Sequence, residues 1–300
     1  MVDVSEGPVW SEWKAFSPRQ RMDPAILAEV LDGGQSFRWT LRDHGTWLGL
    51  WGGHVARVRL DPENHLEWSV PGTATALDGD AVARYFDVGR DAAGLADRLP
   101  WRTDAHLARC IEALPGLRIL RQPFGETLLC FLCSSAKRIA QIKQMAALMA
   151  ERLGGPAEVR DPFASFRRLP SWSELAAATE AELRLCLLGF RARYVHQTAR
   201  LLAAHPGWLE ETEELPYAEA RERLCSLPGV GEKIADCVLL YGGGRLEAFP
   251  VDVWILKAMA RRYGLAGWSP RQVAQFGRAH FGPLAGLAQQ YLFAWERRAG

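Results

Sequence analysis

The segment PYAEARERLCSLPGVGEKIADCVLLY, residues 216–241, constrains the fold more than any other stretch of this 300-residue chain. Apolar residues recur every three to four positions on both sides of PGVG, which predicts two helices joined by a tight hairpin. Because glycine tolerates backbone angles closed to other residues, we expect Gly229 and Gly231 to shape this turn. The hairpin N–H groups would face a phosphate diester at the start of the second helix. A plain helical corner also favours glycine, so PGVG alone leaves both interpretations open.

Two charged residues follow the hairpin at informative positions. Lys233 lies in the first turn of the second predicted helix, where the helix dipole and a desolvated site would lower the pKa of an amine and make it a nucleophile. Asp252 begins the next predicted helix after FPV. Most lysines are merely solvated, and an aspartate before an apolar run is commonly an N-cap. Capping and catalysis are compatible, because a cap holds the carboxylate rigidly.

The first hundred residues have a different pattern from the rest. Four short segments rich in β-branched or aromatic residues are separated by RDHG, GG and DPEN, which predicts an antiparallel meander with tight turns. A short helix is expected before it, over 24–34, and two after it, over 80–87 and 91–99. The expected strands are 36–41, 46–52, 54–60 and 65–70.

Helical spacing of apolar residues continues from about residue 101 to the C-terminus, without repeats. The predicted fold class is therefore α+β, with an N-terminal antiparallel sheet module and flanking helices over residues 1–115 and an all-α domain over 116–300. The hairpin unit spans 217–242. The helices expected from about residue 101 onward are 104–114, 123–135, 137–154, 171–188, 191–205, 216–227, 231–242, 251–264, 269–282 and 284–298.

Composition narrows the class of protein. A hydrophobic content of 48% and twelve tryptophans predict a packed globular chain. With 36 basic and 35 acidic residues, the chain is not a generic polybasic protein, although a local basic surface for nucleic acid remains open. MVDVSEGPVW does not resemble a signal peptide, and no apolar run predicts a membrane span. Because most of the six cysteines lie in apolar helical patterns, we expect a reduced cytoplasmic protein, associated with the nucleoid in a bacterium.

The sequence LPGVGEKIADC followed by FPVDV resembles the helix-hairpin-helix-GPD superfamily of base-excision DNA glycosylases, in which a hairpin lysine paired with a downstream aspartate marks bifunctional members. The resemblance spans nearly the whole chain and implies a TATA-binding-protein-like N-terminal module. Four further stretches are similar to the 8-oxoguanine DNA glycosylase branch: GQSFRW (34–39), RQPFGETLLCFLCSS (121–135), LLGFRARYV (187–195) and LAGLAQQYLF (284–293).

This resemblance implies a bifunctional DNA glycosylase and AP lyase for 8-oxoguanine in duplex DNA. Lys233 would attack the anomeric carbon and expel the base, and the resulting Schiff base would permit β-elimination of the 3′ phosphate. Asp252 would stabilise the oxocarbenium-like charge. The target base would have to leave the stack.

The resemblance also implies a base pocket. The carbonyl of Gly34 would accept a hydrogen bond from the ring N–H that distinguishes 8-oxoguanine from guanine. Cys237 and Phe293 would sandwich the flipped base, and Gln289 would bond its Watson–Crick edge. From the residues alone, Gly34 could equally end the preceding helix, while Cys237 and Phe293 fit ordinary core positions.

Further positions are expected to face DNA. Phe190 would fill the stack beside the vacated space and Arg191 would reach the estranged base, although both also fit an ordinary helix start. The hairpin residues Gly229, Val230 and Gly231 would bind the phosphate backbone.

The chain departs from the family at the positions that read the cytosine opposite the lesion. The asparagine run after SS is replaced by Ala136, Lys137 and Arg138, and the following arginine by Gln141. We therefore expect a relaxed preference for cytosine, with Lys137 and Arg138 attracting the backbone non-specifically. Trp254 stands where a phosphate-contacting histidine is common.

The cysteines and the hairpin lysine Lys233 distinguish this chain from related functions, because monofunctional relatives typically lack such a lysine. Relatives with an iron–sulfur cluster need four clustered cysteines near the C-terminus, whereas this chain has none after Cys237, so we expect no cluster, metal or other cofactor. Cys130 and Cys133 form a C-x-x-C pair inside an apolar helix, where core packing is expected. The alternatives are a monofunctional glycosylase for alkylated or other damaged bases and a non-catalytic DNA-binding protein. The expected partner is double-stranded DNA with a damaged base, bound by a monomer.

Overall fold

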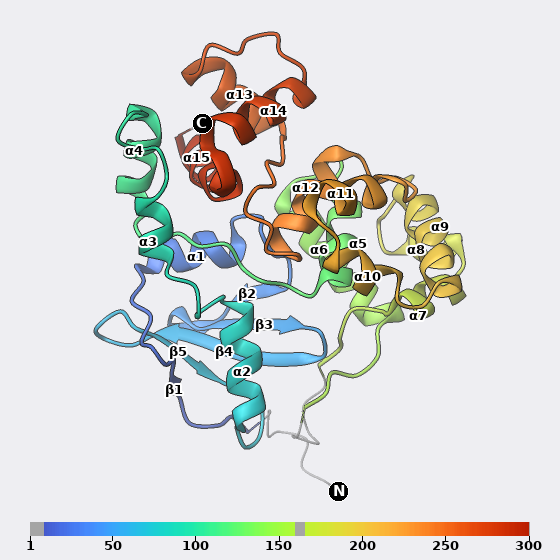
Figure 1. Cartoon of the computed structure of the whole chain (residues 1–300). Helices are drawn as coiled ribbons and strands as arrows, with labels where there is room; N and C mark the ends of the chain where they lie inside the picture. The colour runs from blue at the N-terminus through green and yellow to red at the C-terminus, as the bar shows by residue number, and fades with distance from the viewer. Residues whose placement is uncertain (1–8, 160–165, 300) are drawn as a thin grey trace, which may run out of the picture.

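A five-stranded antiparallel sheet forms one end of the molecule and helices form the remainder, in a computed structural model that describes residues 9–159 and 166–299 (Figure 1). The predicted α+β architecture is confirmed. Residues 1–8, on which most of the signal-peptide expectation rests, lie outside the described residues. In the described part of the chain, no helix is both long and apolar enough to span a membrane.

The sheet follows the predicted meander and adds one strand. Its order is β1-β5-β4-β3-β2 with every neighbouring pair antiparallel. The added strand β1 pairs Lys14 with Trp68, and at two residues it is too short to leave a periodic signal in the sequence. The strands are β1 (Lys14–Ala15), β2 (Trp39–Leu41), β3 (Trp47–Trp51), β4 (His54–Leu60) and β5 (Leu66–Ser69).

Aromatic packing joins the sheet to the helix that follows it. Trp39 is completely buried and donates its indole N–H to the hydroxyl of Tyr85 at 3.0 Å. Gly49 pairs with Trp39 across the strands, and a Cβ there would lie 2.4 Å from the indole, so only glycine fits. The helices and the 3-10 turn of this half are α1 (Pro24–Asp32), η1 (Asp43–Gly45), α2 (Ala76–Tyr85), α3 (Ala92–Asp97) and α4 (Ala105–Ala113).

Helices α5 and α12 lie at the centre of the second half. They pack against each other, and nearly all of their residues are buried, as expected for helices that are apolar on every face. The helices of this half are α5 (Phe124–Leu132), α6 (Ile139–Leu153), α7 (Trp172–Ala177), α8 (Glu180–Leu185), α9 (Arg191–Ala204), α10 (Trp208–Glu214), α11 (Tyr217–Cys225), α12 (Glu232–Tyr241), α13 (Val253–Arg262), α14 (Pro270–Phe281) and α15 (Ala285–Ala299), with the 3-10 turn η2 (Gly282–Leu284).

Two details differ from the sequence predictions. The segment 171–188 is two helices, because Thr179 and Glu182 form a capping box that starts α8 immediately after α7 ends. Helix α10 was not predicted, and it starts after Gly207, whose φ of 88° is left-handed.

The two halves are joined through the C-terminal helix. The carboxylate of Glu29 on α1 is buried and pairs with Arg297 at 2.6 Å and with Arg298 at 3.2 Å, both on α15. Helix α4 also packs against α15. The domain boundary at residue 115 remains a prediction.

Candidate active site

A cavity of about 880 Å³ opens between the two halves. It is walled by the turn after α1 and by residues of α5, α6, α12, α13 and α15, together with the connections next to them. Four of its side chains are basic and one is acidic, so the cavity is locally positive although the chain is nearly neutral. The charged residues are Lys137, Arg138, Lys233, Arg297 and Asp252.

Lys233 reaches the cavity from the first turn of α12, whose N-cap is Gly231. Its amine donates to the hydroxyl oxygen of Ser134 at 3.1 Å and lies 5.3 Å from the centre of the Phe131 ring. Because the Ser134 hydroxyl itself donates to the carbonyl of Phe131 at 2.7 Å, its lone pairs are free for the amine. The lysine is therefore held at a defined point rather than solvated at random.

Asp252 is the N-cap of α13, as predicted. One carboxylate oxygen accepts from the backbone N–H of Trp254 at 3.0 Å and of Ile255 at 2.9 Å. Burial raises the pKa of Asp252, while the two N–H groups and the nearby Lys233 oppose that rise. The carboxylate lines the same cavity as the amine, and a fixed carboxylate and an amine can together stabilise and attack an electron-poor carbon.

The hairpin takes the predicted helix-turn-helix form, but its two glycines are not equivalent. Gly229 has a φ of 79°, and a Cβ there would lie 2.7 Å from the Tyr194 side chain. Gly231 has an extended φ of −99° and open space beside it, so the expectation that it needs a conformation closed to other residues is wrong. Val230 is buried in the core, and its backbone N–H already donates to the carbonyl of Leu227 at 3.1 Å.

Gly34 and Phe293 meet at one wall of the cavity. Helix α1 is capped by Gly33, and Gly34 follows with a φ of 107°. A Cβ on Gly34 would lie 3.1 Å from Ile139 and 3.8 Å from the Phe293 ring, so this backbone can approach a ligand only because it carries no side chain.

Cys237 and Gln289 lie just behind this wall. Each is one helical turn from a cavity residue, Cys237 after Lys233 on α12 and Gln289 before Phe293 on α15, so each shares a helix face with it. Burial raises the pKa of the Cys237 thiol to about 12, which keeps it neutral. The buried amide oxygen of Gln289 has no hydrogen-bond partner within the described residues. An unpaired buried acceptor is costly unless a ligand supplies a donor.

The segment after α5 forms the rim of the cavity. Ala136, Lys137, Arg138 and Gln141 all line it, and Ala136 has a left-handed φ of 52°. The amide oxygen of Gln141 accepts from the backbone N–H of Arg138 at 3.1 Å and so caps α6. Trp254 lines the cavity too and lies 4.6 Å from the amine of Lys257.

Phe190 and Arg191 separate in the structure. Phe190 is 58% exposed at the start of α9, as a side chain that enters DNA would be. That Arg191 reaches the estranged base stays a prediction, and in this structure its side chain points inward. Its guanidinium is buried, lies 4.3 Å from the centre of the Phe190 ring and donates to the backbone carbonyl of Ser135. Through this bond the arginine connects the start of α9 to the rim of the cavity.

Among the cavity residues that the sequence did not single out, Phe131, Ser134 and Arg297 bear most directly on the chemistry. Ser134 lies 99 positions from the lysine that it contacts, and local periodicity contains no signal for such a distant contact. Arg297 lies one turn after Phe293 on α15. It belongs to the charged run ERR, and nothing in that run distinguishes a cavity residue from a solvated one.

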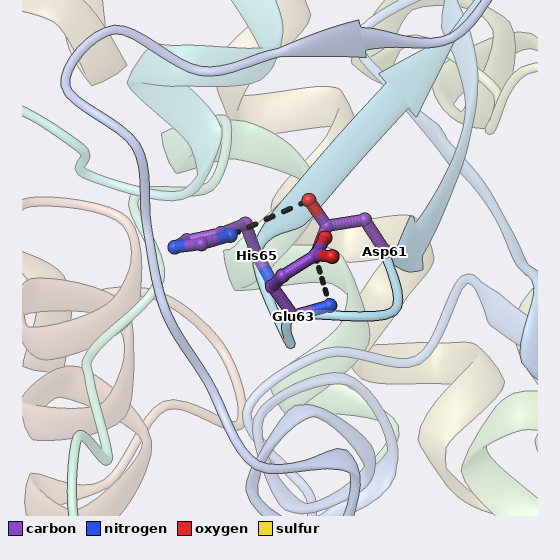
Figure 2. Close-up of side chains that lie close together, drawn as sticks. All are labelled: Asp61, Glu63 and His65. Atoms are coloured by element: carbon purple, nitrogen blue, oxygen red, sulfur yellow. Dashed lines mark hydrogen bonds and ion pairs between the residues drawn. The ribbon is translucent and has the colours of Figure 1, made fainter.

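Two other clusters have structural explanations. Asp61, Glu63 and His65 lie together at the turn between β4 and β5, and one Asp61 carboxylate oxygen lies 3.4 Å from the Nδ1 ring nitrogen of His65 (Figure 2). The other carboxylate oxygen accepts from the backbone N–H groups of Glu63 at 3.0 Å and His65 at 2.7 Å. This is the bonding of a turn-forming aspartate. Cys130 and Cys133 are buried free thiols whose pKa burial raises, which confirms their predicted core role.

Comparison with known proteins assigns the fold and site to a class. Residues 21–128 match the family described as 8-oxoguanine DNA glycosylase, N-terminal domain, and residues 130–281 match the HhH-GPD superfamily of base excision DNA repair proteins. The fold and the hairpin site therefore define a helix-hairpin-helix base-excision protein.

Individual relatives narrow the class. The chain is 32% identical to the N-glycosylase/DNA lyase OGG1 of Arabidopsis thaliana over 276 residues, which are 88% of this chain and 75% of that one. A probable N-glycosylase/DNA lyase of Methanothermobacter thermautotrophicus is 42% identical over 119 residues, which cover 40% of this chain and 38% of that relative. A Clostridium acetobutylicum 8-oxoguanine glycosylase/lyase, solved with double-stranded DNA containing cytosine opposite 8-oxoguanine, superposes with a TM-score of 0.82 at 31% identity over 91% of this chain and 92% of that one. The chain belongs to the 8-oxoguanine DNA glycosylase family.

Proposed function

We propose that this chain is a bifunctional DNA glycosylase and lyase that removes 8-oxoguanine from duplex DNA in base-excision repair. The observation that carries the proposal is the placing of the Lys233 amine and the Asp252 carboxylate at two helix N-termini on one positive cavity. The relatives named as N-glycosylase/DNA lyase and the DNA-bound structure support the same activity.

In the proposed reaction the neutral amine of Lys233 attacks C1′ of the flipped nucleotide. A bond forms between the lysine nitrogen and C1′ while the glycosidic bond breaks; the electron pair of the broken bond leaves with the base, which takes up the proton that the lysine nitrogen then releases. The ionised Asp252 stabilises the positive charge that develops on the sugar. Ring opening gives an imine, and loss of a C2′ proton then expels the 3′ phosphate by β-elimination.

Recognition of the base is assigned to Gly34, Cys237, Gln289 and Phe293, which line the cavity or lie directly behind its lining residues. The carbonyl of Gly34 accepts the ring N–H that guanine lacks, and the orphaned oxygen of Gln289 accepts a donor of the base edge. Phe293 and the neutral thiol of Cys237 supply apolar faces. Gly229 and Gly231 bind a phosphate through their backbone N–H groups, whereas the N–H of Val230, predicted to share this role, is already bonded to the carbonyl of Leu227. Lys137, Arg138 and Trp254 contact the duplex near the cavity rim.

We further propose a relaxed preference for cytosine opposite the lesion. Ala136 has no polar side-chain atom, and because the amide oxygen of Gln141 caps α6, only the NH2 group of Gln141 is left to read a base. The proposed working state is a cytoplasmic monomer that needs no iron–sulfur cluster or metal. Its six free thiols suit a reducing compartment.

Borohydride trapping tests this function. The wild type, Lys233→Gln and Ala136→Asn/Gln141→Arg are each incubated with 8-oxoguanine duplexes carrying each of the four opposite bases, with undamaged duplex as control. We expect a covalent adduct with lesion DNA, no adduct with Lys233→Gln, and rates within about tenfold across the four duplexes. The double variant should favour cytosine more strongly. Binding of lesion duplex without any adduct from the wild type would contradict the bifunctional mechanism.

A further inference from the structure

The turn between α8 and α9 contains an exposed leucine in a conformation that leucine disfavours. Five non-glycine residues in the described part of the chain have a positive φ. Three are histidine, asparagine and aspartate, which are enriched there. The others are Ala136, on the cavity rim, and Leu187, with a φ of 62°. A left-handed leucine brings its Cβ close to the following carbonyl oxygen and costs free energy.

The end of α8 explains the backbone angle of Leu187 but not its side chain. Cys186 is the C-cap, and the N–H of Leu187 closes the helix on the carbonyl of Arg184 at 3.0 Å. The residue after a C-cap is commonly left-handed, and glycine is the usual choice because it adopts that angle freely. Leu187 is also 50% exposed, so burial does not compensate for the strain. Neither local geometry nor core packing therefore accounts for a leucine at this position.

Leu187 belongs to an exposed apolar tip, formed with Leu185 and Phe190. Leu185 is 60% exposed, Leu187 50% and Phe190 58%. They are three of the eight exposed large hydrophobic side chains in the described residues, although they fall within six positions of the chain. An exposed apolar cluster of this kind marks a contact surface.

Contacts connect the apolar tip to the cavity rim on one side and to the hairpin on the other. Arg191 bonds the carbonyls of Ser135 and Leu188 and so joins the turn to the cavity rim. On the other side, the Phe190 ring lies 6.4 Å from that of Tyr194, and Tyr194 abuts Gly229 of the hairpin. The apolar tip therefore lies between the rim and the hairpin, beside the basic cavity.

We infer that Leu187 is a second wedge residue, which enters the base stack together with Phe190 where the damaged nucleotide leaves it. Apolar side chains that insert between base steps unstack them and kink the duplex, and a rigid left-handed turn would hold the leucine outward for this purpose. The inference rests on the proposed function. It predicts that relieving the strain stabilises the protein and impairs base extrusion.

The test compares Leu187→Gly and Leu187→Asn with two controls. His44→Gly relieves a left-handed residue in the β2–β3 turn, and Leu77→Ala shortens a 74% exposed leucine on α2. Each variant is mixed with an 8-oxoguanine duplex carrying 2-aminopurine beside the lesion, and fluorescence, single-turnover excision and Tm are measured. We expect Leu187→Gly to raise Tm by about 2–4 °C, halve the fluorescence rise or more, and slow excision about tenfold.

Leu187→Asn tolerates the left-handed angle while removing the apolar group, so it should show the same loss of fluorescence and excision even if the glycine variant folds poorly. Both controls should keep wild-type fluorescence and excision, and His44→Gly should match the gain in Tm. Wild-type fluorescence and excision in Leu187→Asn would overturn the inference. Absence of excision by the wild type would instead overturn the proposed function.

Discussion

Asp252 shows how one side chain can combine a structural and a chemical task. Its carboxylate caps α13 through two backbone N–H groups and also faces the cavity that contains Lys233. The cap fixes its position, while burial raises its pKa. An asparagine preserves the cap and removes the charge, so the two tasks can be separated experimentally.

The pH dependence of Asp252 follows from the direction of its shift. Excision requires the ionised form of Asp252, so the acid limb of the pH–rate profile should lie above the usual aspartate pKa. Asp252→Asn should lose that limb while excising about 100-fold more slowly.

The same shift affects stability. Because the folded state holds the Asp252 proton more tightly than the unfolded state, the associated stability is present at low pH and is lost as pH rises through the raised pKa. Asp252→Asn should therefore be at least as stable as wild type at neutral pH. Single-turnover rates and urea unfolding across pH measure both effects, and an unchanged acid limb in the variant would contradict the assignment.

At the scale of elements, the two glycines of the hairpin between α11 and α12 have different roles: one is needed for folding, and the other is expected to be needed only for binding DNA. Gly229 is required by its left-handed φ and by Tyr194 beside it, whereas Gly231 has ordinary angles and an open surface. The hairpin is also held to α9, since Thr198 donates to the carbonyl of Pro228 at 3.1 Å. The second glycine therefore has no packing reason of its own.

We expect Gly229→Ala to lower the free energy of unfolding by about 2 kcal/mol, because the new Cβ is strained and crowded. Gly231→Ala should change it by less than about 1 kcal/mol and yet weaken binding to duplex DNA about tenfold, because the methyl group would stand where a phosphate approaches the helix N-terminus. Urea unfolding and fluorescence anisotropy give the two values. Wild-type affinity in Gly231→Ala would show that this part of the hairpin does not approach the backbone.

At the scale of the whole molecule, the ion pairs of Glu29 join the two halves. Helix α1 leads into Gly34, and α15 carries Gln289 and Phe293, so Glu29 and Arg297 connect two walls of the candidate base pocket. The Glu29 side chain is 1% exposed, whereas those of Arg297 and Arg298 are 30% and 39% exposed, so loss of Glu29 leaves two neighbouring positive charges that water solvates only in part.

Glu29→Ala should therefore lower the free energy of unfolding by about 3 kcal/mol and Tm by roughly 10 °C. Glu180→Ala is the matched control, because its pair with Arg184 is also 2.6 Å long but exposed on a single helix. That control should cost less than about 0.5 kcal/mol. Calorimetry of both variants checks the expectation, and equal costs would mean that the buried pair does not hold the halves together.

Much of this protein was predictable from local sequence. Periodicity predicted the meander and most helices, because each element buries one face at its own spacing. Turn and cap residues located the hairpin, the lysine and the aspartate, because these depend on neighbours in the chain. The break between α7 and α8 was missed, since a capping box can interrupt an otherwise continuous apolar pattern.

The sequence alone therefore determined the α+β order of elements and identified Lys233 and Asp252 as a functional pair. Tertiary structure alone decided that Ser134 holds the amine, that Arg191 turns inward, and that Leu187 stands exposed in a strained turn. It also decided which glycine of the hairpin is indispensable. The physical reason is that these features depend on contacts between segments far apart in the chain and on the backbone angles they impose, and neither leaves a periodic trace in the sequence.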